Sequence, residues 1–118
     1  MQTSGQGKEY AYAVLGAGRQ GTAAAYDMAR FGNARKVVLG DVNPKLAREA
    51  ARRVNLLCGR KVAESASVDV RRQVQVKRFL TGIDAFLSAV PYYYNLEIAK
   101  TAIQARASMC DQIGRAHV

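Results

Sequence analysis

Several residue types that build specialised sites are scarce in this sequence of 118 residues. It has no tryptophan, one histidine and two cysteines, Cys58 and Cys110, which stand apart with no C-x-x-C pair and no nearby histidine. Such isolated cysteines do not indicate a structural zinc site, and we predict reduced thiols of a cytoplasmic protein. No metal site is predicted.

Long apolar runs are also missing. No stretch approaches the roughly 20 apolar residues that span a bilayer. The first ten residues, MQTSGQGKEY, have neither the basic region nor the long apolar region of a secretory signal. We therefore expect no membrane partner.

Acidic residues are outnumbered: there are 9 Asp and Glu against 18 Lys and Arg, a formal net charge of +9. Such a surplus is sometimes a nucleic-acid footprint. Here there is no basic tail and no alternation of basic and aromatic residues, so we predict a solvated surface that helps to attract an anionic ligand, and no nucleic-acid partner. Many of these basic residues fall on predicted outer helix faces: Arg48, Arg52, Arg53, Arg71, Arg72, Lys77 and Arg78.

What is present is the composition of one globular domain, with 49% apolar and 23% charged residues. The length leaves room for one core but not for a cofactor domain and a substrate domain together. Residues 1–8 are polar without periodicity and are predicted to be disordered. Residues 9–111 are predicted to form the folded domain.

Apolar runs and helical periodicity alternate along that domain. Short runs predict strands over residues 10–15, 36–41, 61–69, 84–90 and 108–111. Helical spacing predicts helices over residues 19–31, 44–57, 71–80 and 95–105, the second capped by Asn43 and the fourth turning Leu96, Ala99, Ala102 and Ile103 inward. Strands that alternate with helices indicate a doubly wound parallel sheet in an α/β fold.

The turn after the first predicted strand has the spacing G-x-G-x-x-G, formed by Gly16, Ala17, Gly18, Arg19, Gln20 and Gly21. In this context Gly16 permits a tight turn, Gly18 admits a pyrophosphate against the backbone, and Gly21 brings the helix close to the strand. Free N–H groups at the start of the helix would face the phosphates. The alternative is a glycine-rich turn needed only for packing. We predict a dinucleotide-binding Rossmann fold, with three αβα layers, strand order 3-2-1-4-5 and an incomplete C-terminal end.

Asp41 ends the second predicted strand, where a carboxylate can accept both hydroxyls of the adenosine ribose. It would repel a 2′-phosphate, and the next residues, Val42, Asn43 and Pro44, include no arginine. The sequence therefore predicts NAD as cofactor, with NADP less favoured, and Val42 and Asn43 beside it. The alternative role for Asp41 is helix initiation, although Asn43 is the better cap.

The ends of the third and fourth predicted strands complete the candidate site. Asp69 and Val70 are expected to flank the adenine. Ala89, Val90 and Pro91 are expected where the chain passes over the dinucleotide. The tyrosines that follow, Tyr92, Tyr93 and Tyr94, cannot all be buried, so at least one is expected to face the cleft, unless they form a lid over the sheet edge.

Three segments carry a resemblance to a known family: VLGAGRQGTAAAYDMARFG, VVLGDVN and DAFLSAVPYYYNLEIAKTAI. Together they resemble the N-terminal domain of the saccharopine dehydrogenase family, in particular its lysine 6-dehydrogenase-like members, over residues 10–111. The resemblance implies NAD contacts at Gly16, Gly18, Gly21 and Asp41, and places Tyr92 near an amino-acid substrate. It also implies an oxidoreductase of lysine metabolism that oxidises a C–N bond, and a homo-oligomeric full-length parent.

The last residues depart from that family's pattern, which continues after the fifth strand into an Asp-x-Gly-Gly turn. Residues 113–118, IGRAHV, are what a common sequencing adapter encodes in one frame. We therefore expect residues 112–118 to be a non-native tail on a truncated fragment that is inactive by itself. The alternatives are a stand-alone NAD-sensing module and, less favoured because Arg19 and Gln20 break G-x-G-x-G spacing, a methyltransferase.

Overall fold

Strands and helices alternate from end to end of the computed structural model, which describes residues 7–111. The strands are β1 (Tyr10–Leu15), β2 (Ala34–Asp41), β3 (Ala63–Ser67), β4 (Ala85–Ser88) and β5 (Ser108–Asp111). The helices are α1 (Arg19–Phe31), α2 (Pro44–Cys58), α3 (Gln73–Leu80) and α4 (Asn95–Ala105), with a 3₁₀ turn, η2 (Tyr92–Tyr94), before the last. The expected tail over residues 112–118 and most of the expected disordered start lie outside the described residues.

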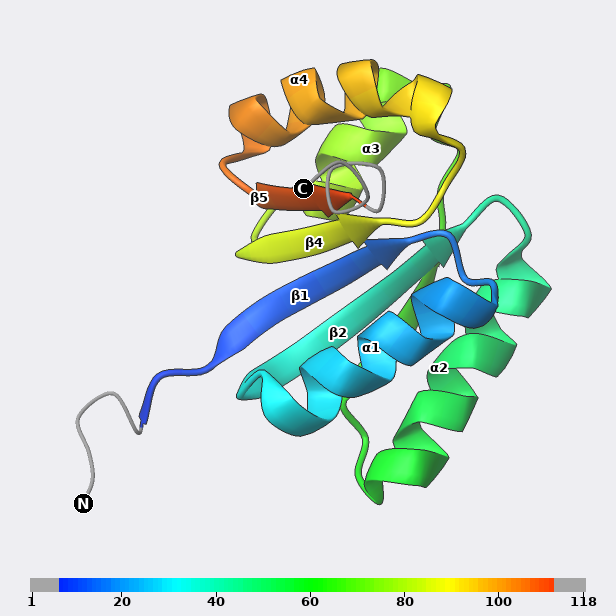
Figure 1. Ribbon diagram of the computed structural model, residues 1–118, viewed down its shortest axis with the longest axis vertical. Helices are drawn as coiled ribbons and strands as arrows, with labels where there is room; N and C mark the ends of the chain where they lie inside the picture. The colour runs from blue at the N-terminus through cyan, green and yellow to red at the C-terminus, as the bar shows by residue number, and fades with distance from the viewer. Residues whose placement is uncertain (1–6, 112–118) are drawn as a thin grey trace.

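All five strands are parallel and lie in the order β3-β2-β1-β4-β5 (Figure 1). The central strand β1 pairs with β2 on one side and with β4 on the other, so that Tyr12 lies between Val37 and Ala85. Helices α1 and α2 cover one face of the sheet, and α3 and α4 cover the other. The doubly wound Rossmann fold predicted from the sequence is confirmed.

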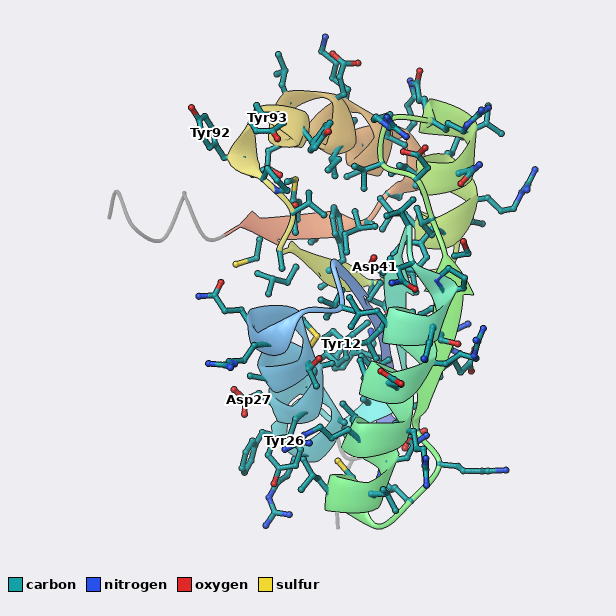
Figure 2. All side chains as sticks on the ribbon, turned by 90° about the vertical axis from the view of Figure 1, so that its right-hand side faces the viewer. Tyr12, Tyr26, Asp27, Asp41, Tyr92 and Tyr93 are labelled. Atoms are coloured by element: carbon teal, nitrogen blue, oxygen red, sulfur yellow. The ribbon has the colours of Figure 1, made fainter. Side chains whose placement is uncertain are left out.

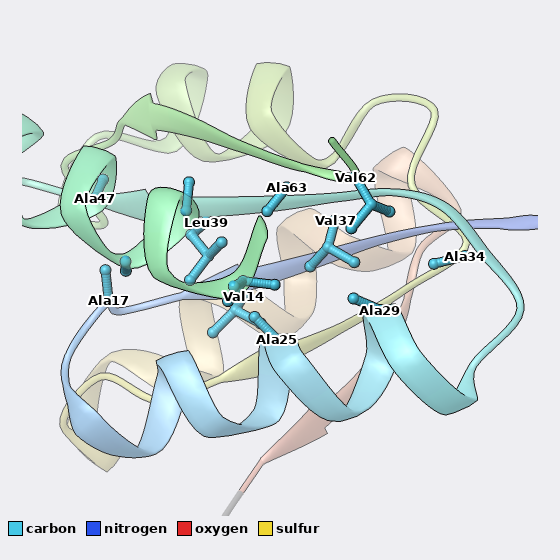
Figure 3. Packing of buried hydrophobic residues seen from close by; sticks show 13 residues of the cluster. Val14, Ala17, Ala25, Ala29, Ala34, Val37, Leu39, Ala47, Val62 and Ala63 are labelled. Carbon is cyan, nitrogen blue, oxygen red and sulfur yellow. The ribbon is translucent and has the colours of Figure 1, made fainter. Parts of the chain in front are cut away.

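Successive side chains of each strand point to opposite faces of the sheet, so the core is divided into two clusters, one on each face. On the α1–α2 face, Val14 and Val37 pack against small residues of α1, including Ala25 and Ala29 (Figure 3). On the α3–α4 face, the neighbouring residues of β1 pack against Phe86 and Ile98, together with other buried apolar side chains. Both faces of the sheet are therefore buried, which is the usual condition of a parallel sheet.

The N-terminal half of α1 lies almost in contact with the turn after β1. A Cβ atom added to Gly21 would stand 1.9 Å from the carbonyl oxygen of Gly16, a distance that no side chain tolerates. Ala25 is fully buried one turn later. Small residues on this stripe thus allow the close approach of helix and sheet that the sequence predicted.

Helix α2 begins and ends at residues suited to those positions. The Asn43 side chain accepts hydrogen bonds from the N–H groups of Lys45 and Leu46, and Pro44 occupies the first turn. Gly59 ends the helix in the left-handed conformation at φ 71°. The predicted cap at Asn43 is confirmed.

The predicted inward face of α4 is wrong at two positions. Leu96 is 67% exposed and Ile103 is 78% exposed, whereas Ile98, Thr101 and Ala102 are buried. The helix has apolar residues on both sides, so its periodicity does not fix which side packs; contact with α3 and β5 does. The strand expected over 61–69 is likewise shorter, Ala63–Ser67, because only its middle pairs with β2.

Candidate functional site

A pocket of about 460 Å³ opens where the carboxyl ends of the strands meet. The turns after β1, β2, β3 and β4 all contribute to its wall, as expected at the switch point of a doubly wound sheet. Its lining residues are Gly16, Gly18, Gly40, Asp41, Val42, Leu46, Val68, Asp69, Val70, Arg71, Ala89, Val90, Pro91, Tyr93 and Tyr94.

Gly16 makes the tight turn at the end of β1. Its φ is +100°, a value that residues with a side chain rarely adopt, and a Cβ there would lie 3.0 Å from the carbonyl oxygen of Ala89. Its N–H donates to the carbonyl of Gly40 at 2.7 Å, which ties the turn to the end of β2. The local fold itself therefore requires glycine at position 16.

Gly18 differs, because nothing in the local fold requires glycine there. Its φ of −74° and ψ of −164° are open to any residue, and an added Cβ would meet no atom within 4 Å. It is the N-terminal cap of α1, and no side chain caps the first N–H groups of the helix. Local packing explains why positions 16 and 21 are glycine, but it does not explain Gly18. At Gly18 the uncapped N–H groups of α1 give a positively polarised and open surface beside the pocket.

The Asp41 carboxylate joins two of the turns that form the pocket. One oxygen, Oδ2, accepts from the N–H of Ala17 at 2.8 Å, and Oδ1 accepts from the N–H of Asn43 at 2.9 Å. The side chain is half-buried at the start of α2 (Figure 2). These bonds fix the carboxylate at the pocket wall and leave lone pairs on both oxygens for further donors.

Asp69 and Arg71 form a two-bond ion pair at the end of the pocket near β3. Nε of Arg71 donates to Oδ1 of Asp69, and Nη2 donates to Oδ2, each at 3.0 Å. The side-chain and backbone hydrogen bonds from Arg71 lower the pKa of Asp69 from 3.8 to about 2. Asp69 is therefore an anion, and its charge is matched by a guanidinium already engaged with it.

The three consecutive tyrosines occupy different surroundings. Tyr93 and Tyr94 line the pocket, with ring centroids 4.7 Å apart. Tyr92 does not line the pocket, and it points away from the sheet in Figure 2. The buried Ser88 hydroxyl donates to the Asn95 side chain at 2.8 Å, which links the two ends of this connection. At least one tyrosine was expected to face the cleft, and Tyr93 and Tyr94 do so.

Most of the candidate residues lie together, but not all of them line the pocket. The lining includes these predicted residues: Gly16, Gly18, Asp41, Val42, Asp69, Val70, Val90 and Pro91. Five others do not line it: Ala17 and Asn43 lie in the turns after β1 and β2, and the first residues of α1 are Arg19, Gln20 and Gly21.

Sequence reasoning missed four lining residues, namely Gly40, Leu46, Val68 and Arg71. Leu46 lies in the first turn of α2 and is 37% exposed. Arg71 was expected on an outer helix face, yet it precedes α3 and turns back to Asp69. Its position two residues after a strand-ending aspartate was the available signal.

Two other kinds of site were sought in the described residues. Over 7–111 no group of three or more His, Cys, Asp or Glu side chains is placed to hold a metal ion. In the same range no helix has the length and apolar character needed to cross a membrane.

A comparison with protein families matches residues 12–117 to the saccharopine dehydrogenase NADP binding domain. That match covers the sheet from Tyr12 onward, the glycine turn and the whole pocket wall.

Solved structures with the same fold include several dehydrogenases. The chain is similar to apo saccharopine dehydrogenase (L-Glu forming) from Saccharomyces cerevisiae, with 20% identity, a TM-score of 0.69, and coverage of 86% of this chain and 21% of that one. It is also similar to quinate dehydrogenase from Corynebacterium glutamicum in complex with NAD, with 18% identity, a TM-score of 0.63, and coverage of 86% and 44%. The chain thus spans less than half the length of either protein. At these identities the likeness establishes the fold.

Proposed function

Because the chain belongs to the saccharopine dehydrogenase family, as its NAD(P)-binding Rossmann domain, we propose that its pocket holds NAD within an oxidoreductase that acts on a C–N bond of an amino acid. The observation that supports this most directly is Gly18. A glycine that the fold does not need, at an uncapped helix start beside a pocket, fits a place where a ligand must approach the backbone.

Each part of the dinucleotide has suitable partners among these residues. The N–H groups at the start of α1, at Arg19 and Gln20, suit the pyrophosphate, since no side chain competes for them. The fixed Asp41 carboxylate suits the two hydroxyls of the adenosine ribose. Val70 and Val90 offer apolar walls for the adenine.

The preference for NAD over NADP rests on charge. A 2′-phosphate would lie close to the Asp41 carboxylate and be repelled by it. The guanidinium of Arg71, the arginine in the pocket wall, is already held by Asp69 at 3.0 Å and is not free to offset that repulsion. The matching family is named for NADP, so the preference is a property to be measured.

When bound, a nicotinamide cofactor supplies the acceptor for a hydride taken from the substrate. The described residues account for the binding of its adenosine and pyrophosphate half. We assign the selection of an amino-acid substrate, and the residues that act on it, to the remainder of a longer protein. The chain corresponds to only 21% of the yeast saccharopine dehydrogenase, which leaves ample room for such a part.

The test is calorimetric titration of the chain with NAD, before and after the change Gly18→Val. A Cβ atom added at position 18 meets no atom of the protein within 4 Å, so the fold should persist, but the valine side chain would occupy the space of the pyrophosphate. We expect NAD binding to be lost while the circular dichroism spectrum is unchanged.

Gly7→Val is the matched control, since Gly7 also has no atom within 4 Å of an added Cβ but does not line the pocket. The control should bind NAD as the unmodified chain does. Unchanged NAD affinity in folded Gly18→Val protein would contradict the assignment of the pyrophosphate site.

A further inference from the structure

Besides the pocket, the edge of the sheet formed by β3 is also open. It is the edge opposite β5. Among the strands of residues 7–111, β3 is the first in the order β3-β2-β1-β4-β5 and so has a neighbour on one side only. The N–H of Val37 donates to the carbonyl of Val62, and the N–H of Val68 donates to the carbonyl of Asp41. Even-numbered residues of this segment therefore direct their backbone groups toward β2, and odd-numbered residues direct theirs outward.

Side chains cover the two ends of this outward edge. Oδ1 of Asn55 accepts from the N–H of Ala63 at 2.8 Å, and its Nδ2 donates to the carbonyl of the same residue at 3.0 Å. At the far end Oε1 of Gln75 accepts from the N–H of Asp69 at 2.9 Å. Both side-chain amides thus form the hydrogen bonds that the backbone of a neighbouring strand would form.

Between those two ends the edge is bare. The outward N–H and C=O groups of Ser65 and Ser67 have no partner in the part of the chain that the structure describes, and both residues are exposed. Unpaired backbone groups in strand register form a template for another strand. The uncovered length suits a short extended segment.

Hollows flank this bare edge on both faces of the sheet. On the α2 side a groove of about 580 Å³ lies between the helix and the start of β3, lined by Arg48, Arg52 and Lys61 among others. On the α3 side a groove of about 520 Å³ has a mixed lining, in which Val38 and Phe79 lie among polar residues that include Lys36 and Arg78. The side chains of an added strand would alternate between these two grooves.

The positive charge of the α2-side groove favours an acidic partner. Within residues 7–111 its four basic side chains, Arg48, Arg52, Arg60 and Lys61, form no ion pair, and Glu64 is the one acid in its lining. Arg60 donates to the carbonyls of Ala29 and Ala34. A second copy of the same edge would bring like charges together, which opposes self-pairing. The phosphates of a nucleic acid would match the charge of the groove, but they would not pair with the N–H and C=O groups along the β3 edge.

We propose that the β3 edge docks an extended acidic segment of a partner protein, which adds a sixth strand beside Ser65 and Ser67. Its acidic side chains face Arg48 and Arg52, and its apolar side chains face Val38 and Phe79. Backbone pairing supplies the main attraction, and alternate side chains supply the specificity. This docking surface is separate from the dinucleotide pocket and does not depend on it.

The test uses a blocked eight-residue peptide of alternating glutamate and valine, added to the full chain labelled for NMR. We expect the amide signals of Ser65 and Ser67 to shift and their hydrogen exchange to slow. The same peptide with N-methyl groups on alternate residues, or with lysine in place of glutamate, should not bind. Arg52→Glu should weaken binding about tenfold at low salt. Arg53→Glu is the matched control, because Arg53 is an exposed neighbour that lines neither groove, and it should change binding little.

Several results would overturn the proposal. No binding up to peptide concentrations on the order of 1 mM would do so, as would equal binding of the N-methylated peptide or equal losses with Arg52→Glu and Arg53→Glu. Slowed exchange at Ser65 and Ser67 on concentrating the chain alone would show self-pairing instead. Displacement of the peptide by an eight-nucleotide oligothymidine that binds more tightly would show a nucleic-acid surface.

Discussion

Single side chains hold the wall of the pocket in place, and Asp41 is the clearest case. Its two carboxylate oxygens accept from backbone N–H groups of two different turns, at Ala17 and Asn43. The carboxylate is thus oriented before any ligand arrives. A group fixed in this way loses little freedom on binding, which favours affinity.

Replacing this residue tests the cofactor preference. Asp41→Ser should lower NAD affinity, because each hydrogen bond lost to a charged acceptor costs about 1.5–3 kcal/mol. It should also reduce the discrimination against NADP, since the repelling charge is gone. Titration of both cofactors against both proteins measures the two effects. Asp27→Ser, a change of an exposed acid on α1 outside the pocket, should alter neither. A preference of the unmodified chain for NADP would show that our interpretation of Asp41 is wrong.

The ion pair between Asp69 and Arg71 makes a prediction about pH. The folded pKa of Asp69, about 2, lies below the ordinary value of 3.8, so the pair stabilises the fold above about pH 4. That contribution is lost as the pH falls from 4 to 2. An NMR titration of the Asp69 carboxyl should give a midpoint near 2, and Arg71→Gln should return it toward 3.8. Arg72→Gln is the control, since Arg72 is a minor cause, and should move the midpoint far less. A midpoint near 3.8 in the unmodified chain would contradict the pair.

At the scale of one element, α4 gives a test of which helix face is packed. Ile98 is 1% exposed in the α3–α4 cluster, whereas Ile103 is 78% exposed. Ile98→Ala should therefore cost about 2–5 kcal/mol of unfolding free energy, and Ile103→Ala less than about 0.5 kcal/mol. Urea unfolding of both variants measures the difference. The reverse order would restore the face expected from the sequence.

The sequence predicted best where local and tertiary preferences agree. Helix α1 has the predicted limits Arg19–Phe31, because the glycine turn starts it and Gly32 stops it. The inward face of α4 was not predictable, since apolar residues occur on both of its sides and only packing selects one. In the candidate site, residues tied to strand ends were predicted, and side chains that bend back, such as Arg71, were not. The spacing places Arg71 close to Asp69 along the chain, but it does not by itself show that the side chain turns back to the carboxylate.

At the scale of the whole molecule, we expect this chain to bind the cofactor without catalysing the oxidation of a substrate. The pocket wall comes from the four turns at one edge of the sheet, which is where we propose that the cofactor binds. Positioning a substrate against the cofactor is worth roughly 7–11 kcal/mol of the barrier. We expect the 118 residues to bind NAD but to give no NADH from lysine or saccharopine. Absorbance at the NADH band measures turnover, with a full-length family member as the positive control. Robust turnover by this chain would refute the assignment of substrate chemistry to a further part.

The division of the core by the sheet also determines which apolar surface is exposed while the chain is being synthesised. Strands β1 to β3 and helices α1 and α2 leave the ribosome first, and they contain most of what the α1–α2 cluster needs. The other side of β1, with Ala11, Ala13 and Leu15, stays uncovered until α3 and α4 have emerged. A stalled nascent chain of that length would therefore expose a flat apolar surface, the kind of transient surface that chaperones bind.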